Sequence, residues 1–253
     1  MHHLHIPRLL KEVGRIFHSK GYEAFLVGGA LRNRLAGFPE TDFDLATNAR
    51  PEAVLEMFRR VIPTGIKHGT VTVFYKGEKI EVTTFRTESD YSDARHPDSI
   101  VYIGDILGDL KRRDFTINSL ALNLATGELL DPHEGRRDIK GQTIRAIGNP
   151  SERFSEDGLR LMRACRFACE LDFTIEEATL RGMCESADRI DRVSPERIQD
   201  ELVKILASPK PSTALLLMDE TGLLARLLPE LTEGKGVEQK GMHEFDVFKH
   251  SIL

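Results

Sequence analysis

Two aspartates separated by one residue are the first candidates for chemistry in this sequence. Asp42 and Asp44 flank Phe43, and in a strand residues i and i+2 project from the same face. Adjacent carboxylates repel each other unless a cation lies between them, and Mg²⁺ prefers oxygen ligands of this kind. Glu81, in the alternating run KIEVTTF, is either a third ligand of the same metal or an ordinary edge residue. The pattern indicates a candidate divalent metal site, with an exposed acidic turn as the alternative.

Two glycines form a candidate phosphate-binding turn. Gly28 and Gly29 follow the apolar run AFLV and precede a helical pattern. Glycines let the backbone approach a phosphate closely, and the N-terminus of the following helix supplies N–H groups that lack partners within the helix. Tight packing is the more common use of such a turn, so this turn alone does not identify a phosphate site.

A cluster of charged residues in the run RRDFTIN offers further phosphate ligands. Arg112 and Arg113 carry forked guanidinium groups that match phosphate oxygens. Asp114 and Asn118 lie four residues apart, which is one helical turn, and would offer polar groups to a ribose. The charged first turn of an ordinary helix is the alternative interpretation.

A fourth candidate lies in the run EDGLRLMR. At 100° per residue Glu156, Arg160 and Arg163 share one stripe of a helix, and Asp157 lies next to it. A carboxylate accepts hydrogen bonds and a guanidinium donates them, so Asp157 and Arg160 together match the edge of a nucleobase. A salt-bridged helix surface is the more common outcome of such a pattern.

The composition excludes several classes of protein. The chain has 253 residues and a net charge of −5, so RNA or DNA would have to bind at a local basic patch. Trp is absent, which disfavours a broad base-stacking platform. Cys165, Cys169 and Cys184 show no CxxC spacing, which disfavours a disulfide framework or a zinc site. Without a secretory signal or a long apolar run, a cytoplasmic protein with no membrane partner is expected.

The periodicity of apolar residues predicts the elements that must position these groups. Strands are expected at 22–27, 41–47 and, as an antiparallel hairpin, at 70–75 and 79–85. Helices are expected at 4–19, 30–35, 51–61 and 106–110, with a polar loop at 87–99 and a charged turn at 131–140. The second half is helical, with helices expected at 154–171, 176–187, 195–207, 211–221 and 223–228. Strands followed by helices predict an α+β fold.

The combination and order of these runs resemble a known family. FDLAT, RRDFTIN and EDGLRLMRACRFA are similar to motifs of the class II CCA-adding enzymes (tRNA nucleotidyltransferases) and the bacterial poly(A) polymerases, and similar stretches span residues 25–202. The resemblance implies a polymerase-β-like nucleotidyltransferase head with a small mixed sheet at 1–140. It also implies a helical, nucleotide-templating neck at 141–207 and the start of a helical body or tail at 208–253. The polypeptide is expected to be part of a longer one.

The resemblance also implies a role for each candidate residue. Asp42 and Asp44 would hold two Mg²⁺ ions, with Glu81 as a third ligand in question. The residues expected to contact the nucleotide are Gly28, Gly29 and Arg32 at the triphosphate, Arg112, Asp114 and Asn118 at phosphate and ribose, Asp157 and Arg160 at the base, and Arg163 near the phosphates. Glu156, Arg197 and Glu201 would support the templating pair. The chain has Asn33 where the family usually has Asp, which puts a helix-supporting contact beside Arg32 in question.

The implied activity is the addition of C, A or both from CTP and ATP to the 3′ end of tRNA, with release of pyrophosphate. A bacterial poly(A) polymerase is one alternative and an inactive RNA-binding relative is another. The intact polar loop at 87–99 disfavours an enzyme that adds C alone. The oligomeric state stays open.

Overall fold

The computed structural model describes residues 6–39, 42–89, 99–239 and 244–253. Contacts between Cα atoms divide these residues into a first unit that ends at Gly141 and a second unit from Gln142 to Leu253. Each unit is described by itself. None of the helices in the described ranges is long and apolar enough to cross a bilayer.

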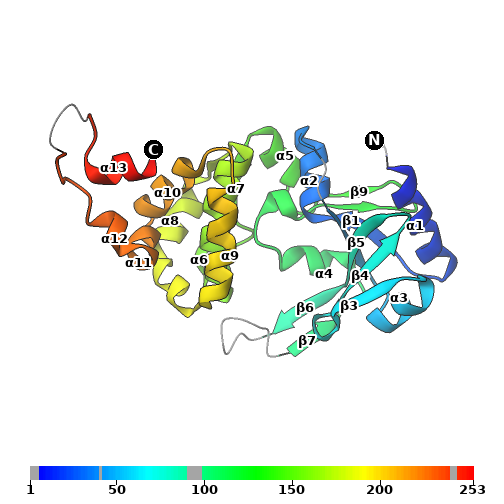
Figure 1. Cartoon of the computed structure of the whole chain (residues 1–253). Coiled ribbons are helices and arrows are strands. Elements are labelled where there is room, and N and C mark those ends of the chain that lie inside the picture. The colour runs from blue at the N-terminus through cyan, green and yellow to red at the C-terminus, as the bar shows by residue number, and fades with distance from the viewer. Residues whose placement is uncertain (1–5, 40–41, 90–98, 240–243) are drawn as a thin grey trace. The chain divides into compact units, whose positions relative to one another are not determined.

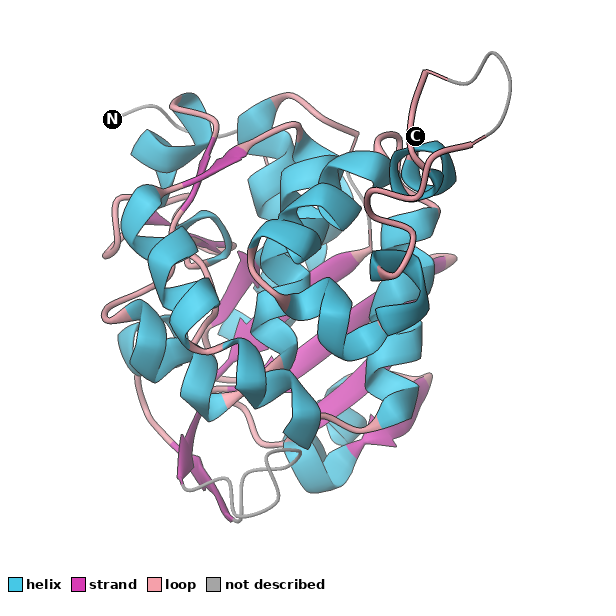
Figure 2. Ribbon diagram, turned by 90° about the vertical axis from the view of Figure 1, so that its left-hand side faces the viewer, coloured by secondary structure: helices cyan, strands magenta, loops and turns pink. Residues whose placement is uncertain are grey.

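The first unit is built on a mixed sheet whose strands are among the magenta arrows of Figure 2. Its described strands are β1 (Ala24–Val27), β2 (Phe43–Thr47), β3 (Val61–Gly65), β4 (Thr70–Tyr75), β5 (Glu78–Thr84), β8 (Ala121–Asn123) and β9 (Leu129–Leu130), in the order β3-β4-β5-β2-β1-β8-β9. The β2–β5 pair is parallel and the other pairs are antiparallel. The predicted hairpin, β4 with β5, and the expected mixed sheet are confirmed.

Five helices and two 3₁₀ turns accompany the sheet in the described part of the first unit. They are α1 (Arg8–Ser19), α2 (Gly28–Ala36), α3 (Pro51–Met57), α4 (Ile106–Lys111) and α5 (Gly135–Lys140), with 3₁₀ turns η1 (Ile66–His68) and η2 (Thr116–Asn118). In α1, Leu10, Val13 and Phe17 recur at helical spacing and are fully buried. One cluster of the core contains residues that are far apart in the sequence of this unit. In it, Phe25 and Phe85 pack with Leu110 of α4.

The second unit is helical except for a short parallel pair, β10 (Thr143–Ile144) with β11 (Thr174–Ile175). Its described helices, coloured from green to red in Figure 1, are α6 (Pro150–Glu156), α7 (Leu159–Leu171), α8 (Glu177–Glu185), α9 (Pro195–Leu206), α10 (Pro211–Glu220), α11 (Leu223–Leu227), α12 (Pro229–Thr232) and α13 (Val247–Ile252), with a 3₁₀ segment η3 (Ala187–Arg192). Proline at the first position suits helices such as α6, α9 and α10, because its missing N–H has no partner there in any case. Most of α7 is buried, and it packs against α9 and α10.

The single long helix predicted at 154–171 is wrong, because the chain breaks it at Asp157. The segment 154–171 consists of two helices, α6 and α7, and Asp157 between them has extended backbone angles. Gly158 follows because a Cβ atom there would lie 2.3 Å from the carbonyl oxygen of Arg189 in η3. The break therefore depends on close backbone packing between Gly158 and η3, and Asp157 lies in this break instead of next to the stripe within one continuous helix.

Three other predicted boundaries also differ from the structure. The helix expected at 51–61 ends at Met57, because Phe58 is extended and Val61 begins β3 by pairing with Val73 of β4. The charged turn expected at 131–140 contains α5. The ends of the polar loop expected at 87–99 form a two-stranded ladder, β6 (Arg86–Ser89) with β7 (Ser99–Tyr102), and its centre lies outside the described residues.

Candidate active site

The candidate metal carboxylate Asp44 lies at the point where three strands and a helix N-terminus meet. In the sheet Asp44 pairs with Val27 at the end of β1 on one side and with Glu81 of β5 on the other. Gly28, the next residue after β1, begins α2 with a φ of +69°. A Cβ atom on Gly28 would lie 3.0 Å from Oδ2 of Asp44, so glycine is required there for both its backbone angle and its size. The predicted turn of Gly28 and Gly29 thus lies directly beside the first candidate carboxylate.

The electrostatics of Asp44 suit a cation. Burial and repulsion by Glu81 raise the pKa of Asp44 to about 6, with a further contribution from Asp42, while Arg113 acts in the opposite direction. Asp42 is exposed in the bend before β2 and not in the strand itself, yet it is near enough for its charge to act on Asp44. A carboxylate whose charged form is destabilised in this way gains from a bound divalent cation. The donor set therefore fits the metal expected from the sequence.

Glu81 is engaged with a neighbouring lysine. Its Oε1 lies 3.1 Å from Nζ of Lys79 on the same strand, and its side chain is 43% exposed. Within the described ranges no three His, Cys, Asp or Glu side chains are arranged to hold a metal ion. The role of Glu81 as a third ligand stays a prediction.

A hydrogen-bond network links α2 to the RRDFTIN segment. Nη1 of the buried Arg32 donates to Oδ1 of Asn118 at 2.9 Å, and Nδ2 of Asn118 donates to Oδ1 of Asp114 at 3.0 Å. Arg32 also donates from Nε and Nη2 to Oδ1 of Asn33, at 3.1 and 2.8 Å. The amide oxygen of Asn33 thus accepts a two-pronged contact from Arg32, so the contact that the sequence put in question is present without the expected carboxylate charge.

The two arginines of the RRD run are held by an acid that sequence reasoning missed. Asp109 on α4 is 1% exposed; its Oδ1 accepts from Nε and Nη2 of Arg112 at 3.0 and 2.8 Å, and its Oδ2 accepts from Nη2 of Arg113 at 3.2 Å. Burial opposes ionisation, but the charges of Arg113 and Arg112 hold the pKa of Asp109 below its usual value. The spacing of Asp109 three and four residues before the arginines is a helical signal that could have been noticed.

Arg113 lies near the candidate metal carboxylate Asp44 and acts on its charge. A Cβ atom on Gly28 would lie 3.7 Å from Nη1 of Arg113 and 3.0 Å from Oδ2 of Asp44, and Nη1 also donates to the carbonyl oxygen of Asn118 at 3.2 Å. The sequence offers both arginines as phosphate ligands and the resemblance favours Arg112; in the structure Arg113 is the one whose charge acts on Asp44.

In the second unit the candidate templating residues are each held by a partner. Nη2 of Arg197 on α9 donates to Oδ2 of Asp157 at 2.7 Å, and Oδ1 of Asp157 accepts from the N–H of Leu159 at 3.1 Å. Arg160 is 7% exposed and its Nη1 donates both to Oε2 of Glu156 and, at 2.8 Å, to the carbonyl oxygen of Arg153. Both side chains of the predicted pair therefore have fixed orientations.

The remaining candidates of this unit lie nearby, with one difference in contacts. The guanidinium of Arg163 lies over the ring of Phe167, 5.1 Å from its centroid. Glu201 is 2% exposed, and its Oε1 accepts from Nε of Arg166 at 2.5 Å. Glu201 thus holds α7 through Arg166 and, in the described structure, makes no contact with the side chains of Asp157 or Arg160. Of the two predicted supports on α9, Arg197 is the one that touches the pair.

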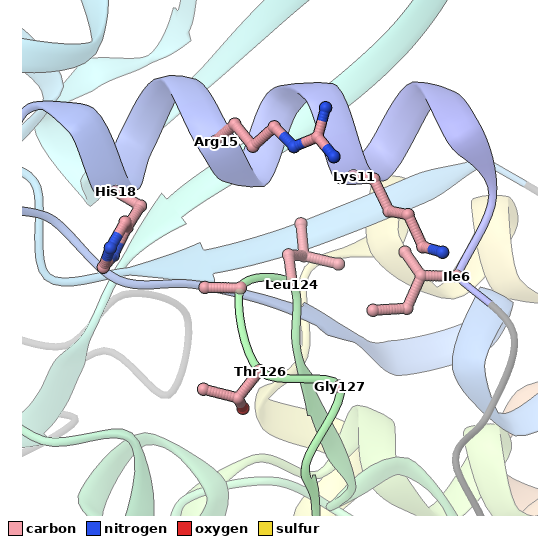
Figure 3. Close-up of a pocket in the computed structure, with 8 residues that line it drawn as sticks. Ile6, Lys11, Arg15, His18, Leu124, Thr126 and Gly127 are labelled. Atoms are coloured by element: carbon pink, nitrogen blue, oxygen red, sulfur yellow. The ribbon is translucent and has the colours of Figure 1, made fainter.

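A cavity of about 550 Å³ lies elsewhere in the first unit. As Figure 3 shows, Lys11, Arg15 and His18 of α1 face it from one side, and Leu124 and the turn through Thr126 lie on the other. None of the candidate active-site residues lines this cavity, so it is separate from the site described above.

Comparison with known proteins identifies the family of this chain. Residues 24–145 match the family model described as the poly(A) polymerase head domain, and residues 172–235 match a model described as a probable RNA- and SrmB-binding site of polymerase A. The CCA-adding enzyme of Enterococcus faecalis is 49% identical over 204 residues, which cover 79% of this chain and 50% of the relative. That of Lactobacillus johnsonii is 44% identical over 215 residues, covering 85% and 53%.

Solved structures show the same relationship. The Bacillus stearothermophilus CCA-adding enzyme in complex with CTP superposes with a TM-score of 0.80 at 40% identity, over 87% of this chain and 53% of that one. The Thermotoga maritima CCA-adding enzyme complexed with tRNA gives a TM-score of 0.73 at 28% identity, over 89% and 54%. The chain thus spans about half the length of the relatives it matches. It belongs to the family of the CCA-adding enzymes and the poly(A) polymerase head domain, whose members are nucleotidyltransferases that generally depend on a metal.

Proposed function

We propose that this chain carries the catalytic part of a tRNA nucleotidyltransferase that adds C and A from CTP and ATP to the 3′ end of tRNA and releases pyrophosphate. The observation that carries the proposal is the position of Asp44 between a helix N-terminus, a second carboxylate and an arginine. Carboxylates for cations beside N–H and guanidinium groups for phosphates are the requirements of phosphoryl transfer. The relatives named CCA-adding enzyme, one solved with CTP and another with tRNA, support the choice of substrates.

Asp42 and Asp44 are the residues proposed to hold two Mg²⁺ ions, with Glu81 as a further ligand. When bound, such ions lower the pKa of the attacking 3′ hydroxyl and neutralise charge on the leaving pyrophosphate. The raised pKa of Asp44 supports this assignment, because its charged form is poorly compensated within the protein.

The proposed phosphate ligands are the N-terminus of α2 at Gly28 and Gly29 and the two arginines held by Asp109. Guanidinium groups fixed in this way donate to phosphate oxygens without first losing side-chain freedom. The proposal also keeps Arg32 as a triphosphate contact, and Asp114 and Asn118, which are bonded to each other, at the ribose. Arg163 is proposed to act near the phosphates.

Asp157 and Arg160 are proposed to read the edge of the base, in a helical neck at 141–207 that follows a head at 1–140 and precedes a body at 208–253. Their side chains are 19% and 8% exposed, and Arg197 and Glu156 hold them in place. A wrong base would leave at least one of these poorly hydrated groups unpaired, at a cost of about 1–3 kcal/mol for each. That difference is sufficient to favour CTP and ATP over UTP and GTP.

The test is one set of primer-extension assays. Transcripts of tRNA ending before CCA, after CC and after CCA are each offered CTP or ATP with Mg²⁺, next to an unrelated oligoribonucleotide. The proposal expects C on the first, A on the second and no addition to the third. Long A tails on the unrelated oligoribonucleotide would instead identify a poly(A) polymerase.

Two variants test the assignment of the carboxylates. Asp42→Ala and Asp44→Asn should abolish extension while binding of tRNA, measured by filter retention, stays near that of the wild type. Extension at the wild-type rate by Asp42→Ala would refute the metal assignment.

A further inference from the structure

Asp44 and Arg113 carry opposite charges and lie near each other, yet they are not paired, and the proposed function does not explain why. The Oδ2 atom of Asp44 and the Nη1 atom of Arg113 both lie within 4 Å of the point where a Cβ atom on Gly28 would be. The two charges attract each other, since the charge of Arg113 lowers the pKa of Asp44. Yet within the described residues these two groups form no ion pair, and Arg113 is instead bonded to Asp109 and to the carbonyl oxygen of Asn118.

The competing carboxylate is well placed to hold Arg113. Asp109 is 1% exposed, whereas the side chains of Arg112 and Arg113 are 21% and 19% exposed, so the acid lies beneath both arginines. One carboxylate shared by two guanidinium groups leaves the cluster with a net positive charge. The cluster therefore keeps its attraction for an anion while Arg113 is kept in a fixed position.

We propose that Asp109 is a positioning residue of the candidate active site, which holds Arg113 away from Asp44 and so leaves the Asp44 carboxylate available to a divalent cation. Without Asp109, Arg113 would be free to pair with the Asp44 carboxylate, on which its charge already acts, and would compete there with the metal. This inference rests on the proposed function, because it treats Asp44 as the metal ligand. It adds a residue that never touches substrate, and it gives the buried acid a role beyond that of an ordinary structural ion pair.

The experiment measures Mn²⁺ binding to the full chain by electron paramagnetic resonance, without nucleotide or RNA. Asp109→Asn keeps the shape of the side chain and removes its charge, and it should weaken Mn²⁺ binding about tenfold, because a charge-assisted Arg113–Asp44 pair then opposes the metal. The double variant Asp109→Asn/Arg113→Gln removes the competing cation and should restore binding to near the wild-type value. The matched control is Asp105→Asn, at the exposed N-cap of the same helix, where asparagine caps equally well and Mn²⁺ binding should not change.

A merely structural role for Asp109 would give a different pattern. In that case the double variant would bind Mn²⁺ no better than Asp109→Asn, and this result overturns the proposal, as does unchanged binding in a folded Asp109→Asn. If Asp109→Asn does not fold, Arg113→Gln alone decides: the proposal expects Mn²⁺ binding at least as tight as in the wild type, and weaker binding overturns it.

The test of Asp109 can fail or succeed independently of the test of the proposed function. A wild-type chain that binds Mn²⁺ and shows the expected variant pattern but extends no RNA refutes the function and retains the role of Asp109. If the wild-type chain extends tRNA but Asp109→Asn binds Mn²⁺ as tightly as the wild type, this inference alone is refuted. A wild-type chain that binds no Mn²⁺ overturns the inference.

Discussion

Replacing Gly28 by alanine tests the geometry at the centre of the candidate site. Gly28 has a φ of +69°, and a Cβ atom there would lie 3.0 Å from Oδ2 of Asp44. Gly37, at the other end of the same helix, has a φ of +79° and no atom of the described residues within 4 Å of its Cβ position. The two positions therefore share the same backbone strain and differ in what the new methyl group meets.

The expected magnitudes follow from these distances. An L residue in the left-handed region costs about 1–2 kcal/mol, so both Gly28→Ala and Gly37→Ala should lose that much stability. At position 28 the carboxylate must also withdraw by a few tenths of an ångström to reach ordinary van der Waals contact. Since a misplacement of about 1 Å can cost about 100-fold in rate, a shift of this size should cost about tenfold.

The assay compares unfolding in urea with the rate of CTP incorporation into tRNA that lacks CCA. Both variants should lose at least about 1–2 kcal/mol of stability from the backbone strain that they share. Gly28→Ala should extend the primer about tenfold more slowly, and Gly37→Ala should keep a rate within about twofold of the wild type. Equal rates in the two variants would refute the claim that Gly28 sets the position of Asp44.

Two further predictions concern the second unit. Glu176 caps α8 by accepting hydrogen bonds from the N–H and the hydroxyl of Thr179. Burial raises the pKa of the Glu176 carboxyl, but these hydrogen bonds and the charge of Arg145 outweigh burial and hold that pKa below its usual value. The ionised Glu176 carboxyl therefore contributes its full stabilisation of the fold at any pH above its pKa in the unfolded chain. This stabilisation is lost as the pH falls through the lower pKa that the carboxyl has in the folded protein. Glu176→Gln should cost about 1 kcal/mol in urea unfolding at pH 7, and the difference from the wild type should shrink as acid protonates the Glu176 carboxyl, whereas a difference that stays constant with pH would refute the cap assignment. Arg197→Met removes the 2.7 Å bond to Asp157 and should lower the preference for CTP over UTP by about threefold to tenfold in competition assays, whereas an unchanged preference would contradict its supporting role.

Local patterns were sufficient to predict the elements around the candidate metal carboxylate Asp44. The alternation of apolar residues predicted the β4–β5 hairpin, and two glycines after an apolar run predicted the turn before α2. Such signals depend on residues close in the sequence, which periodicity can detect. The fold class followed from them and from the motifs that resemble the family.

Features that depend on distant contacts could not be read in this way. The break between α6 and α7 exists because Gly158 packs on the carbonyl of Arg189, and nothing in the periodicity of 154–171 indicates it. The importance of Asp109 depends on its burial, which the sequence does not show. Its spacing from Arg112 was visible, but an exposed ion pair at the same spacing would contribute little.

The strand arrangement also explains why the charge of Asp44 is poorly compensated within the protein, and this leads to a last prediction. β2 lies parallel to β5 in a register that places Asp44 directly beside Glu81, so the fold itself brings two carboxylates together. Burial and this repulsion raise the pKa of Asp44 from 3.8 to about 6, so its ionised form at neutral pH destabilises the folded state by up to about 3 kcal/mol. Asp44→Asn removes that charge, and the variant should melt at a higher temperature than the wild type in EDTA at pH 7.5. Mg²⁺ should raise the melting temperature of the wild type and leave that of the variant almost unchanged. A variant that melts lower than the wild type in EDTA would show that Asp44 is compensated within the protein and needs no metal.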